Sequence, residues 1–171
     1  MTGKGRSMID KLLGIKEKKM GGDSLDEIAE ACRMMAEQKT GALIVIQRNN
    51  SLNYVIETGD EVDARISRRL IMNIFFKNSP LHDGAMIIRG DRIVAARCTL
   101  PITSRTDIPA KFGMRHRAAV GISEETDADV IVVSEETGEI SFVREGRIEK
   151  IGNINELKLL LGAGENLSED N

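Results

Sequence analysis

The sequence predicts an α/β fold, with a mixed central β-sheet flanked by helices in a single compact domain. Three observations favour this fold class. The 171 residues match the size of one ordinary domain, and hydrophobic residues make up 41% of them, enough for a real core. Short apolar runs typical of buried strands lie among segments of helical periodicity. Because strands and helices do not alternate strictly, we expect a mixed sheet.

The N-terminal segment, residues 1–22, is interpreted as a basic lead-in or linker. Its basic residues are interspersed with apolar ones, and it ends at two glycines. Two interpretations stay open: a solvated, frayed tail, or a juxtamembrane segment that lies on anionic lipid or follows a membrane anchor. The sequence itself has no apolar run long enough to span a bilayer and no secretory signal.

The first predicted helix begins at Ser24. Ser24 and Glu27 have the spacing of a capping box, and apolar residues follow at helical intervals. The apolar run at 41–46 predicts a buried strand. A turn rich in Asn and Ser comes next, and a short strand is expected at 52–56.

The middle of the chain is predicted to hold a second helix and a hairpin. Apolar residues recur every four positions from 62 to 74, which predicts a helix that ends near 76. The β-rich segments at 85–89 and 93–99 flank a Gly-Asp pair and predict a hairpin. Residues 100–112 contain two prolines and are expected to form a loop.

The last third is predicted to contain a helix at 115–123, strands at 130–134 and 139–144, and a helix at 154–161. Gly162 is expected to end that helix. The polar tail, residues 163–171, is expected to be disordered.

Charge and cysteine content exclude some classes of function. The formal net charge of −3 argues against a general nucleic-acid-binding protein, which would carry a basic excess. Cys32 and Cys98 lie far apart and lack metal-ligand spacing, so we expect two buried, reduced thiols. The phosphate-loop and dinucleotide-binding signatures are both absent, so any nucleotide site must be built in another way.

The first candidate motif is the segment at 81–85, where a loop enters a strand. His82 and Asp83 both have side chains that bind divalent metals, although neighbours on a regular strand point to opposite faces. Both reach one metal only if the chain bends, and Gly84 makes a bend plausible and allows close approach of a ligand. The structural alternative is a plain turn.

The second candidate motif, at 113–119, places a glycine before a predicted helix. The free N–H groups of a helix start attract anions, and the arginines and histidine that follow add the charge that a triphosphate needs. Successive helical residues differ by about 100°, so three in a row cannot all face one ligand. Arg115 and His116 are therefore expected on the phosphates, and Arg117 in a structural role. The alternative is a solvated basic turn.

The third candidate motif, at 132–138, lies where a strand ends in a turn. The functional hypothesis gives Ser134 a hydrogen bond to phosphate and Glu135 a metal. The structural alternative is that the adjacent acids are simply solvated.

Taken together and in this order, the three motifs resemble the diadenylate cyclase (DAC domain) family. The resemblance runs from about residue 24 to 147 and also takes in the segments at 39–46 and 74–80. The resemblance implies that residues 23–162 form the catalytic domain. The helix that leads into Lys39-Thr40-Gly41 resembles the cytosolic catalytic domain of the membrane-linked branch, which implies a cytoplasmic location, at the inner face of the membrane if a native anchor is missing.

The resemblance implies a reaction. Two protomers meet face to face, each with one ATP, and each 3′-hydroxyl attacks the α-phosphorus of the other ATP. The products are cyclic di-AMP and two pyrophosphates. A two-fold symmetric product fits a homodimer with an isologous interface. Mg²⁺ or Mn²⁺ would neutralise phosphate charge and acidify the hydroxyl.

The resemblance also implies roles for individual residues. The catalytic residues would be Asp83, Arg115 and His116. The expected metal ligands are Asp83, His82 and Glu135. The expected nucleotide-binding residues are Gly84, Ala85, Leu100, Met114, Arg115, His116 and Ser134, with Leu100 near the adenine.

Two positions depart from the family pattern. Met114 replaces a Thr or Ser found in many members, which removes a hydroxyl contact to phosphate. Thr99 lies where membrane-linked relatives often have Tyr, so aromatic stacking on adenine is in doubt there. Met114 keeps a second hypothesis open, a weakly catalytic sensor module that binds ATP or cyclic di-AMP.

Overall fold

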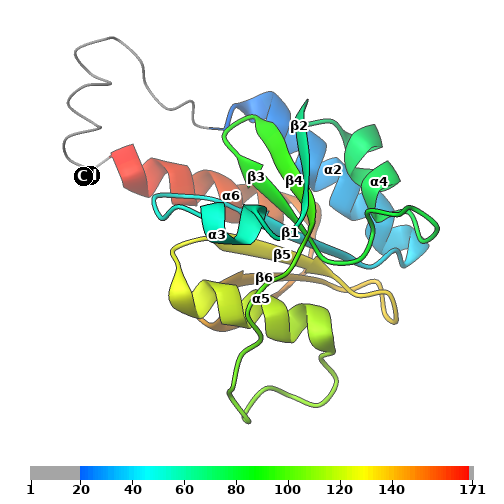
Figure 1. Ribbon diagram of the computed structural model, residues 1–171, viewed down its shortest axis with the longest axis vertical. Coiled ribbons are helices and arrows are strands. Elements are labelled where there is room, and N and C mark those ends of the chain that lie inside the picture. Colours follow the sequence, from blue (N-terminus) through cyan, green and yellow to red (C-terminus); the bar gives the residue numbers. More distant parts are fainter. Residues whose placement is uncertain (1–19, 170–171) are drawn as a thin grey trace.

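Seven strands form one mixed sheet in the computed structural model, which describes residues 20–169 and the side chains of residues 20–162. The sheet order is β2-β4-β3-β1-β5-β6-β7, and Figure 1 labels these strands apart from β7. In chain order the strands are β1 (Ala42–Ile46), β2 (Asp60–Arg65), β3 (Ala85–Arg89), β4 (Arg92–Cys98), β5 (Asp129–Val133), β6 (Ile140–Arg144) and β7 (Arg147–Ile151).

The centre of the sheet is β1, which pairs in parallel with β3 and antiparallel with β5. The other neighbouring strands are all antiparallel. Every residue of β1 and β5 is buried, as expected for strands covered on both faces. The edge strand β2 alternates between half-buried and exposed residues. The prediction of a mixed α/β sheet in one domain is confirmed.

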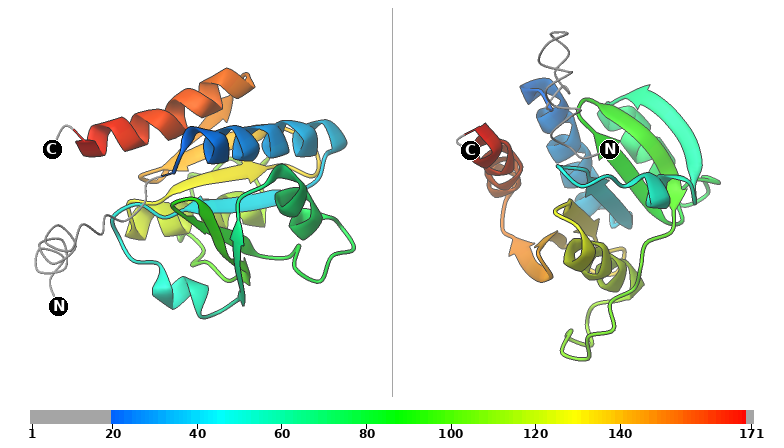
Figure 2. Two further views of the ribbon diagram at one scale, coloured as in Figure 1. Left: turned by 90° about the horizontal axis from the view of Figure 1, so that it is seen from above. Right: turned by 60° about the vertical axis from the view of Figure 1, so that its left-hand side comes forward.

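Helices cover both faces of the sheet (Figure 2). They are α2 (Gly22–Gln38), α3 (Asn53–Ile56), α4 (Arg68–Phe75), α5 (Met114–Glu125) and α6 (Ile154–Glu169). Helices α2, α4 and α6 pack on one face, and α3 and α5 on the other. Ala42, Ile44 and Ile46 belong to the first core, whereas Leu43 and Val45 belong to the second, because neighbouring strand residues point to opposite faces.

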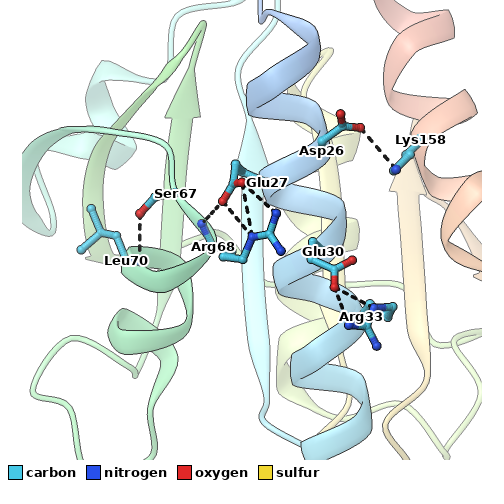
Figure 3. Close-up of polar contacts among 8 residues, drawn as sticks. All are labelled: Asp26, Glu27, Glu30, Arg33, Ser67, Arg68, Leu70 and Lys158. Carbon is cyan, nitrogen blue, oxygen red and sulfur yellow. Dashed lines mark hydrogen bonds and ion pairs between the residues drawn. The ribbon is translucent and has the colours of Figure 1, made fainter.

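Polar contacts tie α2 to its two neighbouring helices (Figure 3). Glu27 accepts hydrogen bonds from the Arg68 guanidinium and from the Arg68 backbone N–H at the start of α4. Asp26 pairs with Lys158 of α6 at 3.3 Å. Ser67 caps α4, with its Oγ accepting the Leu70 N–H at 3.1 Å. The three helices thus form one layer.

The predicted capping box at Ser24 is wrong. Helix α2 begins at Gly22 with Gly21 as its N-cap, and no side chain caps it. The Ser24 hydroxyl instead donates to Asp91 Oδ1 at 2.8 Å, and Gly21 N–H donates to the same oxygen at 2.7 Å. The start of α2 is therefore fixed by the turn between β3 and β4, which is distant in sequence.

Two further predictions assign the wrong type of secondary structure. The segment predicted as a strand at 52–56 is instead the short helix α3 with Leu52 as its N-cap, and the buried Leu52 and Val55 lie three positions apart, which is helical spacing. The predicted helix from 62 to 76 is two elements, β2 and then α4. A repeat of four fits both cases, since every fourth residue also lies on one face of a strand.

The C-terminal part differs from the sequence prediction in two ways. Strand β7 was not predicted, and it extends the sheet by pairing with β6. Helix α6 continues through Gly162 to Glu169, although a stop was expected at Gly162. Residues 1–19 of the predicted lead-in lie outside the described residues. Within the described part of the chain, no helix is long and apolar enough to cross a membrane.

Candidate active site

A cavity of about 760 Å³ brings the three candidate motifs together. Its walls come from the loop before β3, the end of β4, the loop that follows, the start of α5 and the turn after β5. Eight residues predicted from the sequence line it: Asp83, Gly84, Leu100, Met114, Arg115, His116, Ser134 and Glu135. The cavity therefore joins segments that are far apart in the chain.

Gly84 shapes the first wall. Its φ of +102° belongs to the left-handed region that favours glycine, and a Cβ there would lie 2.8 Å from the Cys98 carbonyl oxygen. The loop can therefore pack directly on β4, and it leaves the Asp83 side chain exposed at the cavity wall. Asp83 is placed where a carboxylate can meet a ligand and solvent.

The two remaining predicted residues lie outside the lining. The His82 ring turns back on its own loop, with Nδ1 2.7 Å from the Ser79 carbonyl oxygen. Ala85 is fully buried as the first residue of β3, where it pairs with Cys98. Ala85 contributes to the packing behind the wall, and His82 has only Nε2 left for a ligand.

The start of α5 provides an anion-binding end to the cavity. Gly113 is an extended N-cap without a side-chain cap, and Met114 is 64% exposed. The first intrahelical bond runs from Arg117 N–H to Gly113 carbonyl oxygen, so the preceding N–H groups of the first turn are not used within the helix. Free N–H groups and the positive end of a helix favour a negatively charged ligand.

The three consecutive basic residues of α5 do not all face the cavity, as helical geometry predicts. Arg115 and His116 line the cavity, whereas Arg117 does not. The His116 ring is buried and stacks on Phe112 with 4.5 Å between ring centroids. Burial, and secondarily the Arg115 charge, lower the pKa of His116 from its usual value. The imidazole is therefore neutral at pH 7 in the free protein.

Arg115 forms an ion pair with Glu135, which lies in the turn after β5. The Arg115 Nη1 lies 3.6 Å from Glu135 Oε1. In the same turn, Ser134 Oγ accepts the N–H groups of Glu136 and Thr137, each at 3.2 Å. The Ser134 hydroxyl hydrogen is not needed by these contacts and can be donated to a ligand oxygen.

Sequence reasoning missed several residues of the cavity, above all Arg97. Arg97 has a φ of +56° and binds Asp60 through Nε and Nη2 at 2.7 and 3.3 Å. A charged residue inside an otherwise apolar strand was the available signal. Lys111 and Phe112 also line the cavity, from the loop that was expected to be irregular. No pattern in the sequence of this loop indicates that Lys111 and Phe112 lie at the site.

The carboxylates suit a hard divalent cation that is also held by phosphate. Among residues 20–162, whose side chains the structure describes, no three side chains of His, Cys, Asp or Glu gather closely enough to form a metal site by themselves. Asp83 and Glu135 nevertheless both line the cavity. Mg²⁺ is usually bound by one or two carboxylates together with substrate phosphates and water, and these two side chains fit that donor set.

The cysteine prediction is confirmed. Cys32 and Cys98 are both free and buried. Burial raises the pKa of Cys32 to about 12 and that of Cys98 to about 11. Neither thiol is therefore ionised at neutral pH, although Cys98 lines the cavity.

Comparison with known proteins now gives the family. The model described as "DisA bacterial checkpoint controller nucleotide-binding", abbreviated DAC, matches residues 29–148. The chain belongs to the DAC family. Cyclic di-AMP synthase CdaA from Bacillus subtilis is 44% identical over 127 residues, covering 74% of this chain and 46% of CdaA. A diadenylate cyclase from Listeria monocytogenes is 45% identical over 124 residues, covering 72% of this chain and 45% of the relative.

Solved structures of DAC relatives have the same fold. A crystal structure of a DacA double mutant from Staphylococcus aureus superimposes with a TM-score of 0.80 at 42% identity, covering 82% of this chain and 94% of that one. A protein from Bacillus cereus, described as a hypothetical membrane spanning protein, gives a TM-score of 0.72 at 42% identity, covering 74% and 62%. The chain spans about half the length of the CdaA and Listeria relatives.

Proposed function

We propose that this chain is a diadenylate cyclase, which condenses two ATP molecules into cyclic di-AMP and releases two pyrophosphates. The observation that carries the proposal is the single cavity that collects Asp83, the start of α5 and the turn at Ser134. Membership of the DAC family supports it, as do the activities named for the matched relatives.

The basic end of the cavity would bind the triphosphate. Arg115 supplies a fixed positive charge, the first turn of α5 supplies backbone N–H groups, and Ser134 supplies a hydroxyl donor. His116 adds an imidazole whose charge responds to the phosphates. Leu100, Ile102 and Phe112, which all line the cavity, would offer the apolar surface that an adenine ring needs.

Asp83 would act on the sugar of the nucleotide. Its exposed carboxylate accepts the proton of the 3′-hydroxyl as the hydroxyl oxygen forms a bond to the α-phosphorus of the second ATP. The bond between that phosphorus and the bridging oxygen breaks, and pyrophosphate leaves. A second, symmetry-related attack closes the ring, which needs two chains whose cavities face each other.

A divalent cation completes the proposed site. Asp83 and Glu135 would hold Mg²⁺ or Mn²⁺ together with phosphate oxygens, and His82 stays a candidate through Nε2 alone. The bound cation supplies neutralisation of phosphate charge and acidification of the hydroxyl. Glu135 would then exchange its pairing with Arg115 for the cation, which would leave the Arg115 guanidinium free to bind phosphate.

We also propose that the native protein acts at the inner face of the cytoplasmic membrane. The proposal rests on the similarity to CdaA and to the Bacillus cereus protein described as membrane spanning. Nucleic acid is not a proposed partner, because the net charge of −3 lacks the basic excess of nucleic-acid-binding proteins.

The deciding experiment incubates the purified chain with ATP and Mg²⁺ or Mn²⁺ and measures cyclic di-AMP by chromatography, beside Asp83→Asn. Asn nearly matches the shape of Asp but cannot accept the proton, so we expect Asp83→Asn to abolish synthesis with an unchanged unfolding midpoint. Near-normal turnover by Asp83→Asn at saturating metal would remove Asp83 from the mechanism.

The same assay also tests the alternative that Met114 keeps open, a weakly catalytic sensor module that binds ATP or cyclic di-AMP. The exposed Met114 side chain offers no hydroxyl to phosphate, but its backbone N–H remains at the helix start. We therefore expect the native chain to be active and Met114→Thr to change its rate only modestly. A native chain that binds ATP and makes no cyclic di-AMP would show that this protein is a sensor.

A further inference from the structure

The corner between α2 and β1, residues Lys39 to Gly41, lies directly behind the basic end of the cavity. Lys39 has a φ of +52° and ends α2, with its N–H and that of Thr40 bonded back to carbonyls of the last turn. Gly41 is buried and leads into β1.

The side chain of Arg115 lies against Gly41. A Cβ added at Gly41 would be 2.6 Å from Arg115 Nη1, 2.7 Å from Cζ and 2.9 Å from Nη2, and these are its three nearest atoms. The φ of Gly41 is outside the left-handed region, so an alanine could adopt this backbone. Space for the guanidinium is therefore the reason for a glycine at this position.

We propose that Gly41 is a positioning residue for Arg115. The missing side chain at Gly41 leaves room for the guanidinium, which Glu135 contacts at 3.6 Å. The Arg115 side chain is 27% exposed and lines the cavity. A charge held in place before the ligand arrives loses little side-chain entropy on binding. This inference rests on the role of Arg115 as a phosphate contact in the proposed function.

The same corner also fixes the turn that carries Ser134 and Glu135. Gly138 in that turn has a φ of +76°, and a Cβ there would lie 2.5 Å from the Ala36 carbonyl oxygen at the end of α2. The turn therefore packs on the last turn of α2, while Arg115 packs on Gly41. Arg115 and the turn that carries Glu135 therefore both pack against the end of α2 and the corner that follows it.

The first test is Gly41→Ala, with affinity measured by calorimetry against 3′-deoxy-ATP, which binds but cannot react. The methyl group displaces only the far end of a flexible side chain, so the fold persists while the guanidinium moves. We expect affinity to fall about tenfold, as for loss of one charge-assisted contact. Gly22→Ala is the matched control, because no atom lies within 4 Å of its added Cβ, and it should bind like the native chain.

A double-mutant cycle separates positioning from a general structural role. Gly41→Ala should cost no further affinity when combined with Arg115→Ala, because the side chain that it displaces is gone. An equal further loss in that background would overturn the inference. If Gly41→Ala destabilises the fold, Arg115→Ala should restore the unfolding midpoint. Equal destabilisation in both backgrounds would show that the backbone, and not Arg115, requires glycine.

The single variant Arg115→Ala distinguishes this inference from the proposed function. If Arg115→Ala binds 3′-deoxy-ATP as the native chain does, the placement of Arg115 on the phosphates is wrong, and the inference falls with it. If Arg115→Ala weakens binding and Gly41→Ala does not, Arg115 keeps its proposed role and only the positioning by Gly41 is wrong.

Discussion

Arg97 is a second arginine among the residues that line the cavity. Its Nε and Nη2 bond to Asp60, so Nη1 is the nitrogen that would be left for a phosphate. We predict that Arg97→Ala weakens ATP binding by roughly five- to tenfold, because a phosphate loses a charged donor. Adenosine, which has no phosphate, should bind equally to the variant and the native chain in calorimetry.

The chain offers a close control for Arg97. Arg92 forms the same kind of ion pair with Asp63, at 2.8 Å, between the same two strands and with similar exposure, but it does not line the cavity. Arg92→Ala should therefore leave nucleotide binding unchanged. An equal loss of ATP affinity in both variants, or an equal loss for adenosine in Arg97→Ala, would rule out a phosphate contact by Arg97.

His116 should couple nucleotide binding to proton uptake. The pKa of His116 lies below its usual value in the free protein because the ring is buried, and Arg115 adds to the effect. Phosphate beside the ring favours the imidazolium, so the complex has the higher pKa. ATP affinity should therefore rise as the pH falls through the pKa of the complex and level off below the pKa of the free protein.

The measurement is calorimetry of 3′-deoxy-ATP in buffers of different ionisation enthalpy, with His116→Gln as the control for protonation of the nucleotide itself. Equal proton uptake by both proteins would show that His116 does not sense the phosphates. For folding the sign is opposite: the unfolded chain takes up the proton near its ordinary pKa and the folded chain only at lower pH, so stability decreases as pH falls through that interval.

At the scale of elements, predictions from sequence were correct where a local signal, such as a turn sequence or the start of a helix, was sufficient to define the element. The β3–β4 hairpin and helix α5 have such signals and are correctly placed. The segment from 62 to 76 failed because a repeat of four does not distinguish a strand from a helix. The start of α2 failed because Asp91, a residue distant in sequence, binds Ser24 and Gly21.

The same limit applies to the site elements. Helical geometry alone separated Arg115 and His116 from Arg117, and the motifs named most of the residues that line the cavity. Arg97, Lys111 and Phe112 were missed because their position depends on a bulged strand and on a loop held by tertiary contacts. Gly121 is one such contact: a Cβ there would lie 2.0 Å from the Pro101 carbonyl oxygen, so the loop rests directly on α5.

Helix α4 provides a prediction at the same scale. Ser67 accepts the Leu70 N–H at the N-terminus of α4, next to the Glu27–Arg68 pair that joins α4 to α2. Loss of an N-cap acceptor costs about 1 kcal/mol, so Ser67→Ala should lower the free energy of unfolding in urea by about that amount. Ser67→Thr keeps the acceptor and should lose less. Equal losses in the two variants would mean that the cap contributes nothing to the stability of α4.

At the scale of the whole molecule, synthesis should depend on encounter between chains. Specific activity should rise with protein concentration as long as free chains predominate, because ring closure in the proposed mechanism needs two loaded cavities. A preformed dimer would hide this effect, so a mixing experiment is more direct. Asp83→Asn and Arg115→Ala chains, mixed in equal amounts, form hybrid dimers with one defect on each side.

Such hybrids should not make cyclic di-AMP efficiently, since both ring-closing steps are required and each step meets a defective chain. The measurement is product formed by the mixture, compared with each variant alone and with the native chain at the same total concentration. Substantial recovery of cyclic di-AMP in the mixture would contradict a site shared between two chains.

The pairing of β1 also determines when a growing chain can acquire its final form. β1 joins β3 and β5, and β5 begins only at Asp129, so the centre of the sheet needs contacts between segments that leave the ribosome far apart in time. Until Asp129–Val133 has been synthesised, the edge of β1 that faces away from β3 has no partner strand, and unpaired edges invite association with other chains. A polypeptide interrupted before β5 would therefore be prone to aggregation, and it would also lack the turn at Ser134.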